Sequence, residues 1–194
     1  MNTVKHKTPV ALAIICIAIM FMPQHIRESL YLHIDDLKQG GYWRFLTAHL
    51  THYSWTHCLS NIIGLLLLIG IFNDIQQKIH WLRIVMITCI IISSGLMLFS
   101  NQLDWYVGFS GILTSLYAYV SIKGFNENIK VSTFILIVLT AYITIQLSKG
   151  ELISSLLITE LKTSSYAHGF GFIAGVLCAV IELCYQKSIN NNKF

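Results

Sequence analysis

The chain has 194 residues, of which 55% are hydrophobic and 11% are charged, and its mean hydropathy is +0.64. A water-soluble domain of this composition would expose too much apolar surface, so the composition predicts an integral membrane protein and excludes an ordinary soluble enzyme. The formal net charge is +4. We attribute this charge to membrane topology and expect no nucleic-acid partner.

Six apolar runs approach the roughly 20 helical residues that a hydrocarbon core of ~30 Å requires. They cover residues 9–24, 55–72, 81–99, 105–122, 131–147 and 165–185. No other stretch has the composition of a linker. The sequence therefore predicts an all-α, polytopic membrane protein with six transmembrane helices, forming a single domain over residues 1–194 with its core at about 42–185.

Charges suggest how the chain is oriented. Lys5 and Lys7 precede the first run, and no small-residue cleavage site follows it, so we expect an uncleaved span with a cytoplasmic amino terminus. In that orientation eight Lys and Arg residues are cytoplasmic and five lie outside, in agreement with the positive-inside rule.

Two connections have an unusual composition. Residues 23–54 combine aromatic and aliphatic residues with charges, which favours a segment lying in the membrane interface. Residues 152–158, from Leu152 to Ile158, are apolar but too short to span a bilayer. We expect this short segment to cap or gate the outer face.

Polar residues inside the apolar runs carry the functional signal, because polar atoms are costly in lipid. Ser110 lies in the sequence Gly108-Phe109-Ser110-Gly111, and His168 lies on the last span. His57 and Asn61 are four residues apart and thus share one helix face.

Small residues predict a close approach between the fourth and sixth spans. Gly171 and Gly175 follow His168 on one helix, and Gly111 and Ser115 follow Ser110 on the other. Helices with such small-residue faces pack closely in membranes. The hypothesis is that Ser110 and His168 lie at corresponding depth.

The chemistry of these residue types fits a hydrolase. A serine hydroxyl becomes nucleophilic when a base takes its proton, and a neutral histidine such as His168 can do so and return it to a leaving amine. The Asn61 amide, the His57 imidazole and the backbone N–H of Ser110 are candidate donors to an oxyanion. No acid lies close to His168 on its span, so the pattern predicts a Ser-His dyad and not a triad.

Other interpretations remain at this point. Gly-x-Ser-Gly also occurs as a helix-packing motif, and a membrane histidine often bridges helices. His49, His52 and His57 invite a zinc site, but their spacing is loose and no HExxH pattern supports it, so we expect no metal and no cofactor. A transporter or channel would be expected to show inverted repeats or a charged pathway, and the sequence shows neither apart from Glu182 near a span end.

The order of these motifs resembles the rhomboid family of intramembrane serine proteases. The matching residues are Trp43, Arg44, Thr47, His52, His57, Asn61, Gly108, Phe109, Ser110, Gly111, Ala167, His168, Gly171 and Gly175. The resemblance implies a six-helix core, with Ser110 as nucleophile, His168 as base, and His57 and Asn61 as oxyanion donors. It implies structural roles for His52 and the glycines, and it places Trp43-Arg44 in a loop lying partly in the membrane. The implied partners are membrane-anchored protein substrates and the lipid bilayer.

One position departs from the family pattern. Many bacterial rhomboids carry a tyrosine four residues after the serine, where it packs against the histidine, and this chain has Thr114 there. We therefore expect the histidine to be held differently.

The short chain and compact loops resemble the rhombosortase branch of the family. That resemblance implies a protease of the bacterial inner membrane, with its active site open to the periplasm, that cleaves exported proteins at a Gly-Gly sorting segment before a carboxy-terminal anchor. The alternatives are a general rhomboid protease of other single-pass proteins and a non-catalytic rhomboid-like binding protein.

Overall fold

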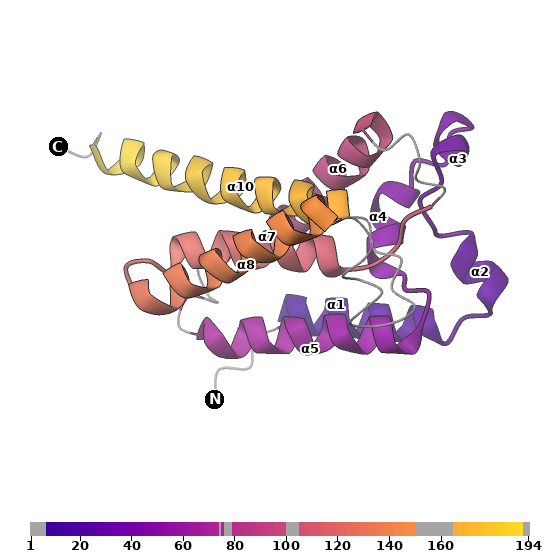
Figure 1. Ribbon diagram of the computed structural model, residues 1–194, viewed down its shortest axis with the longest axis horizontal. Coiled ribbons are helices and arrows are strands. Elements are labelled where there is room, and N and C mark those ends of the chain that lie inside the picture. Colours follow the sequence, from indigo (N-terminus) through magenta and orange to yellow (C-terminus); the bar gives the residue numbers. More distant parts are fainter. Residues whose placement is uncertain (1–6, 74, 76–78, 100–104, 150–164, 192–194) are drawn as a thin grey trace.

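A computed structural model describes residues 7–73, 75, 79–99, 105–149 and 165–191 (Figure 1). These residues form the helices α1 (Lys7–Met20), α2 (Gln24–Glu28), α3 (Ile34–Lys38), α4 (Arg44–Leu50), α5 (Trp55–Ile71), α6 (Trp81–Phe99), α7 (Ser110–Lys123), α8 (Ile129–Lys149) and α10 (Ser165–Asn191). The described part of the chain contains no β-strand, and its extended pairing is an isolated bridge between Leu32 and Tyr106. The predicted all-α class is confirmed.

Among the described residues, three helices are long and apolar enough to cross a membrane: α6, α8 and α10. Helices α4 and α5 together would supply a fourth span, although the chain bends by 89° between them. The helices α1 and α7 are each 14 residues long. By length and composition the described residues thus provide three or four spans of an integral membrane protein, and the count of six stays a prediction.

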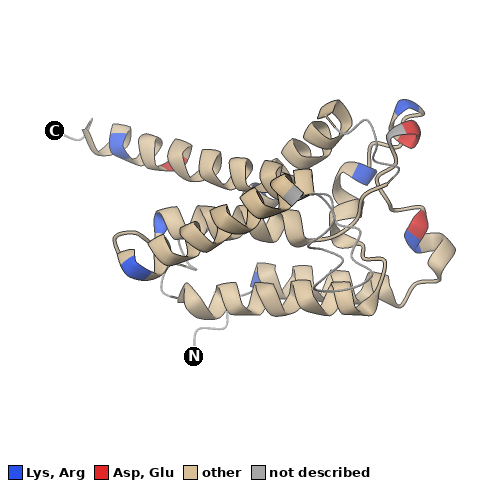
Figure 2. Ribbon diagram, viewed as in Figure 1, with Lys and Arg blue, Asp and Glu red and all other residues tan. Residues whose placement is uncertain are grey.

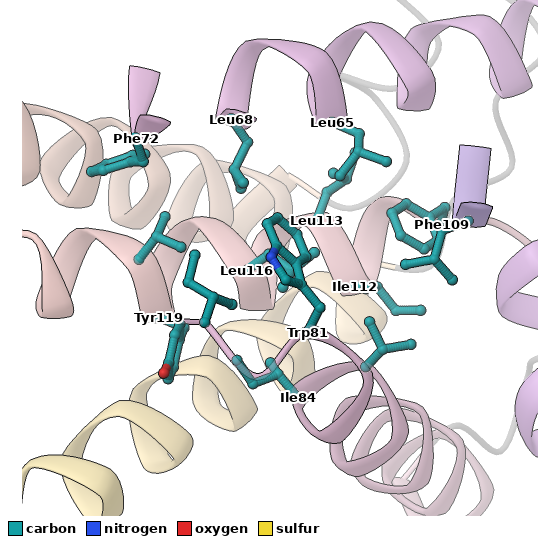
Figure 3. Close-up of a cluster of buried hydrophobic side chains, with 14 of the residues drawn as sticks. Leu65, Leu68, Phe72, Trp81, Ile84, Phe109, Ile112, Leu113, Leu116 and Tyr119 are labelled. Carbon is teal, nitrogen blue, oxygen red and sulfur yellow. The ribbon is translucent and has the colours of Figure 1, made fainter. Parts of the chain in front are cut away.

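Helix α7 lies at the centre of the bundle and packs most extensively against α10, then against α8, α6 and α5 (Figure 1). Nearly every residue between Gly111 and Ser121 is buried. Such a helix, enclosed on all sides, is typical of a buried core element. Figure 3 shows Leu113 and Leu116 of α7 among Leu65 and Leu68 of α5, with Trp81 of α6 beside them.

Helix boundaries differ from the predicted runs where backbone geometry intervenes. The fourth run was expected to span residues 105–122, but α7 begins at Ser110 because Gly108 adopts a φ of +126°, which no right-handed helix contains. Conversely α10 continues six residues past Tyr185, to Asn191, since the Gln and Lys residues there favour a helix in water as well.

The connection over residues 23–54 folds into the three short helices α2, α3 and α4. Arg44 stabilises it by donating to the Tyr31 carbonyl at 2.6 Å and by pairing with Asp36 at 2.9 Å. The short segment from Leu152 to Ile158, expected to gate the outer face, lies outside the described residues.

The charged residues gather at the two ends of the bundle (Figure 2). Lys123, Lys130 and Lys187 lie at the end where α7 and α10 finish. The opposite end carries charges of both signs, namely Arg27 and Glu28 on α2, Asp35, Asp36 and Lys38 on α3, and Arg44 on α4. At the basic end, Glu182 pairs with Arg83 at 2.6 Å and with Lys123 at 3.2 Å. These pairs connect α6, α7 and α10.

Candidate active site

Ser110 is the first residue of α7 and follows a tightly held turn. The backbone N–H of Gly108 donates to the Ala48 carbonyl at 2.9 Å, and the Tyr106 hydroxyl donates to the Gly108 carbonyl at 3.0 Å. Ser110 itself is half-buried, while the residues immediately before it are buried. The turn thus presents a serine hydroxyl at a helix start that remains reachable from outside.

His168 of α10 approaches this hydroxyl directly. Its Nε2 atom lies 2.9 Å from Ser110 Oγ, within hydrogen-bonding distance, although the two residues are far apart in sequence. The imidazole is 2% exposed, so water cannot easily replace the serine as its partner. A hydroxyl paired with a buried neutral histidine is the arrangement that general-base activation of a nucleophile requires.

Small residues make this approach of α7 and α10 possible. A Cβ atom added to Gly171 would collide with the Gly111 carbonyl, and one added to Gly175 would collide with the Ser115 carbonyl. The two helix backbones are therefore in direct contact, as the small-residue faces predicted. Ser115 also bonds to Thr88 of α6 at 2.7 Å, which ties a third helix to the same contact.

His57 lies against the serine turn from the side of α5. Its backbone N–H is capped by the Ser54 hydroxyl at 3.1 Å, which fixes the start of α5. Within the part of the chain that the structure describes, neither ring nitrogen of His57 has a hydrogen-bond partner, although the residue is 2% exposed. Buried polar atoms are normally satisfied, so the His57 ring keeps a hydrogen-bonding capacity that the described residues do not use.

Asn61 lies one turn further along α5 and is also buried. Its Nδ2 atom donates to the His57 carbonyl at 3.1 Å. An amide nitrogen carries two hydrogens, so the Asn61 amide has the capacity to donate to a second acceptor. The structure thus places His57 against the serine turn, and Asn61 is hydrogen-bonded to the His57 backbone.

His52 supports the turn from the bend between α4 and α5. Its Nε2 atom accepts from the backbone N–H of Phe109 at 3.4 Å, and Arg27 donates to its carbonyl at 3.1 Å. His49 instead bonds to Ser93 of α6 at 3.0 Å. Among the described residues no three His, Cys, Asp or Glu side chains come together as a possible metal site.

Arg44 makes its polar contacts within the connection that precedes α5, with Tyr31 and Asp36. The guanidinium of Arg44 sits 5.7 Å from the Trp43 ring centroid, and the Trp43 side chain is exposed. Together with Thr47, whose hydroxyl donates to the Leu30 carbonyl at 3.0 Å, they hold the segment that precedes α5.

Two residues of α8 that contact His168 were not predicted from the sequence. Gln146 Oε1 lies 2.6 Å from His168 Nδ1, and the Tyr142 ring centroid lies 5.6 Å from that of His168. Thr114 does not reach the histidine through its hydroxyl, which donates to the Ser110 carbonyl at 3.0 Å. The sequence did offer one signal for these contacts, because Gln146 is a lone amide in an apolar run and follows Tyr142 by four residues.

Comparison with known proteins identifies the family of the chain. No curated protein gives a significant match to the chain. A family model described as the Rhomboid domain matches residues 39–185, which include the serine turn, His57, Asn61 and His168. The chain therefore belongs to the rhomboid family.

Proposed function

We propose that the protein is an intramembrane serine protease in which Ser110 is the nucleophile and His168 is the general base. The distance of 2.9 Å between Ser110 Oγ and His168 Nε2 carries this proposal. The rhomboid family contains intramembrane serine proteases and also inactive relatives that keep the fold. The presence of both side chains in bonding contact favours an active protease over a binding protein.

The proposed reaction has two stages. In the first, His168 Nε2 takes the proton of Ser110 as Oγ attacks a peptide carbonyl, and the resulting imidazolium gives that proton to the leaving amine when the C–N bond breaks. In the second, water loses a proton to the same nitrogen and attacks the acyl-enzyme, and the proton returns to Ser110 Oγ. Both stages pass through a tetrahedral oxyanion.

Oxyanion stabilisation is assigned to His57, Asn61 and the backbone N–H of Ser110. That N–H belongs to the first turn of α7, where backbone donors have no partner within the helix. The unpartnered ring of His57 and the second amide hydrogen of Asn61 support the same assignment. Donors fixed in this way need no reorganisation during the reaction.

The proposed substrates are exported proteins that carry a carboxy-terminal membrane anchor preceded by Gly-Gly. A substrate helix must unwind before its carbonyl reaches the half-buried Ser110, and glycine destabilises a helix by about 1 kcal/mol relative to alanine. The likeness to rhombosortases supports this choice. A general rhomboid protease without a glycine requirement is the alternative.

The proposed location is a bacterial inner membrane, with the amino terminus in the cytoplasm and Ser110 near the periplasmic face. The concentration of Lys123, Lys130 and Lys187 at the end of the bundle away from Ser110 supports this orientation (Figure 2). Basic residues favour the cytoplasmic side of membrane proteins.

A fluorophosphonate probe tests the chemistry on the purified protein in detergent. We expect the wild-type protein to be labelled covalently, and Ser110→Ala to be unlabelled because its nucleophile is gone. Ser29→Ala, which removes an exposed hydroxyl on the surface, is the matched control and should label normally. Equal labelling of Ser110→Ala and wild type would contradict the proposal.

Substrate choice is tested by co-expression. An exported protein with a Gly-Gly segment before its anchor should lose the anchor with the wild-type enzyme and keep it with Ser110→Ala. If a Gly-Gly→Leu-Leu substrate is processed equally well, a general rhomboid protease is the better description.

A further inference from the structure

Helix α8 directs two polar side chains at the histidine from the side opposite Ser110. Tyr142 and Gln146 are four residues apart and so share one face of the helix. Gln146 Oε1 lies 2.6 Å from His168 Nδ1, and Gln146 Nε2 donates to the Tyr142 hydroxyl at 2.7 Å. The result is a chain of hydrogen bonds from Tyr142 through Gln146 and His168 to Ser110.

The tautomer that His168 must adopt as a base determines which groups donate and which accept in this series of hydrogen bonds. A neutral imidazole carries one proton, on Nδ1 or on Nε2. To accept the serine proton, Nε2 must hold a lone pair, so the ring proton must be on Nδ1. A proton on Nδ1 requires an acceptor there, and Gln146 Oε1 is in place to accept it.

We propose that Gln146 is a positioning residue, which holds His168 in the tautomer and orientation that make Nε2 the base. This inference rests on the proposed function. The Tyr142 hydroxyl acts one step further out, because by accepting from Gln146 Nε2 it fixes which end of the amide faces the imidazole. The Tyr142 ring, 5.6 Å from that of His168, completes the support.

An amide suits this position better than a carboxylate would in the resting enzyme. Gln146 is 5% exposed and lies on a helix long and apolar enough to span a membrane. An ionised group in such surroundings loses its hydration, whereas a neutral amide accepts the same hydrogen bond without a charge.

The residues that pack against His168 also come from a different helix than in the family pattern, which places a tyrosine on the helix of the nucleophile. In α7 the residue four positions after the nucleophile is Thr114, whose hydroxyl is engaged with the Ser110 carbonyl. The aromatic ring beside the histidine is supplied instead by Tyr142 of α8. Helix α8 thereby takes over both the packing and the polar contact on this side of His168.

Kinetics of three variants on α8 test the inference in the full-length enzyme. Gln146→Leu keeps the approximate volume and removes the acceptor, so we expect kcat to fall about 10–10²-fold with little change in KM, a part of the 10²–10⁴ that general-base catalysis contributes. Gln146→Glu restores an acceptor oxygen and should recover most of that rate. Thr144→Val is the matched control, since this exposed hydroxyl bonds to its own helix and should not affect turnover.

The pH profile separates positioning from packing. A carboxylate beside the imidazole stabilises the imidazolium, so the acid limb of kcat/KM should move to higher pH in Gln146→Glu. A loss of packing alone would lower the maximum value of kcat/KM without changing the pH at which its acid limb falls.

Nitrogen-15 spectra of protein labelled at histidine give a readout that does not depend on turnover. The His168 signals are identified by their absence in His168→Ala. We expect the ring proton on Nδ1 in the wild type and a shift of population toward Nε2 in Gln146→Leu. A proton on Nε2 in the wild type, or a wild-type rate in Gln146→Leu, would overturn the inference.

Failure of the inference is distinguishable from failure of the proposed function. If Ser110→Ala cleaves substrate as well as the wild type does, the protease assignment itself fails. If Ser110→Ala is inactive while Gln146→Leu keeps the wild-type rate and tautomer, the protease assignment survives and the role of Gln146 is excluded.

Discussion

Gly108 and His57 occupy adjoining space at the entrance to α7. A Cβ atom added to Gly108 would lie 2.6 Å from His57 Cε1 and 2.8 Å from His57 Nε2, closer than any side chain tolerates. Gly108 also has a φ of +126°, which residues with a Cβ rarely adopt. Two independent constraints thus require glycine two residues before Ser110.

Gly108→Ala should therefore lower both stability and activity. The unfavourable φ costs about 1–3 kcal/mol, and displacement of His57 removes a donor from the proposed oxyanion site. Gly40→Ala is a matched control, because Gly40 also has a positive φ of +93° but no atom lies within 4 Å of its Cβ position. We expect Gly40→Ala to lower thermal stability in detergent while keeping kcat/KM. Unchanged activity in Gly108→Ala would show that the position of His57 does not matter.

The Ser110–His168 pair should behave as one unit in kinetics. Ser110→Ala and His168→Ala should each reduce kcat to the background level, and the double variant should be little worse than either, because each change alone removes the activated nucleophile. Turnover of a reporter substrate by purified protein measures this. If the loss of kcat in the double variant equals the product of the two single losses, Ser110 and His168 act independently.

Gly171→Ala should separate α7 from α10. The new methyl group would meet the Gly111 carbonyl, next to Ser110, and such overpacking typically costs about 1–3 kcal/mol, more than alanine gains in helix propensity. Gly169→Ala on the same helix is the control, since nothing lies within 4 Å of its Cβ position. We expect Gly171→Ala to unfold at lower temperature and to cleave more slowly, and Gly169→Ala to do neither. Similar behaviour of the two variants would contradict direct backbone contact.

Removal of an oxyanion donor should slow turnover without abolishing labelling. His57→Ala and Asn61→Ala are each expected to lose about 10²–10³ in kcat, the usual effect of one such donor. Ser60→Ala is the control for Asn61, because the Ser60 hydroxyl donates to the same His57 carbonyl at 2.9 Å from an exposed position. If Ser60→Ala and Asn61→Ala lose equal activity, Asn61 acts by holding that carbonyl and not as an oxyanion donor.

The apolar runs predicted where the long helices lie, since a bilayer demands continuous apolar segments and the chain satisfies that demand locally. The small residues around Gly111 and Gly171 predicted which two helices touch, because only such residues allow backbone contact. The start of α7 was misplaced by five residues, since hydropathy does not register the φ of a single glycine such as Gly108.

The contacts of α8 escaped prediction for a different reason. A lone glutamine in an apolar run predicts a polar partner but does not say which helix supplies it. The link from Gln146 to His168 depends on how α8 packs against α7 and α10, which is tertiary information. The 89° bend between α4 and α5 is likewise set by packing and not by a proline or a glycine in the intervening residues 51–54.

The shortness and enclosure of α7 bear on how the protein responds to its bilayer. Fourteen residues extend about 21 Å, less than the ~30 Å of a hydrocarbon core, and the helix is covered by α5, α6, α8 and α10. Hydrophobic mismatch acts on helices whose apolar faces touch lipid, and α6, α8 and α10 carry such faces. A thicker or thinner membrane therefore tilts the outer helices first, while the helix that carries Ser110 is shielded from direct contact with the acyl chains.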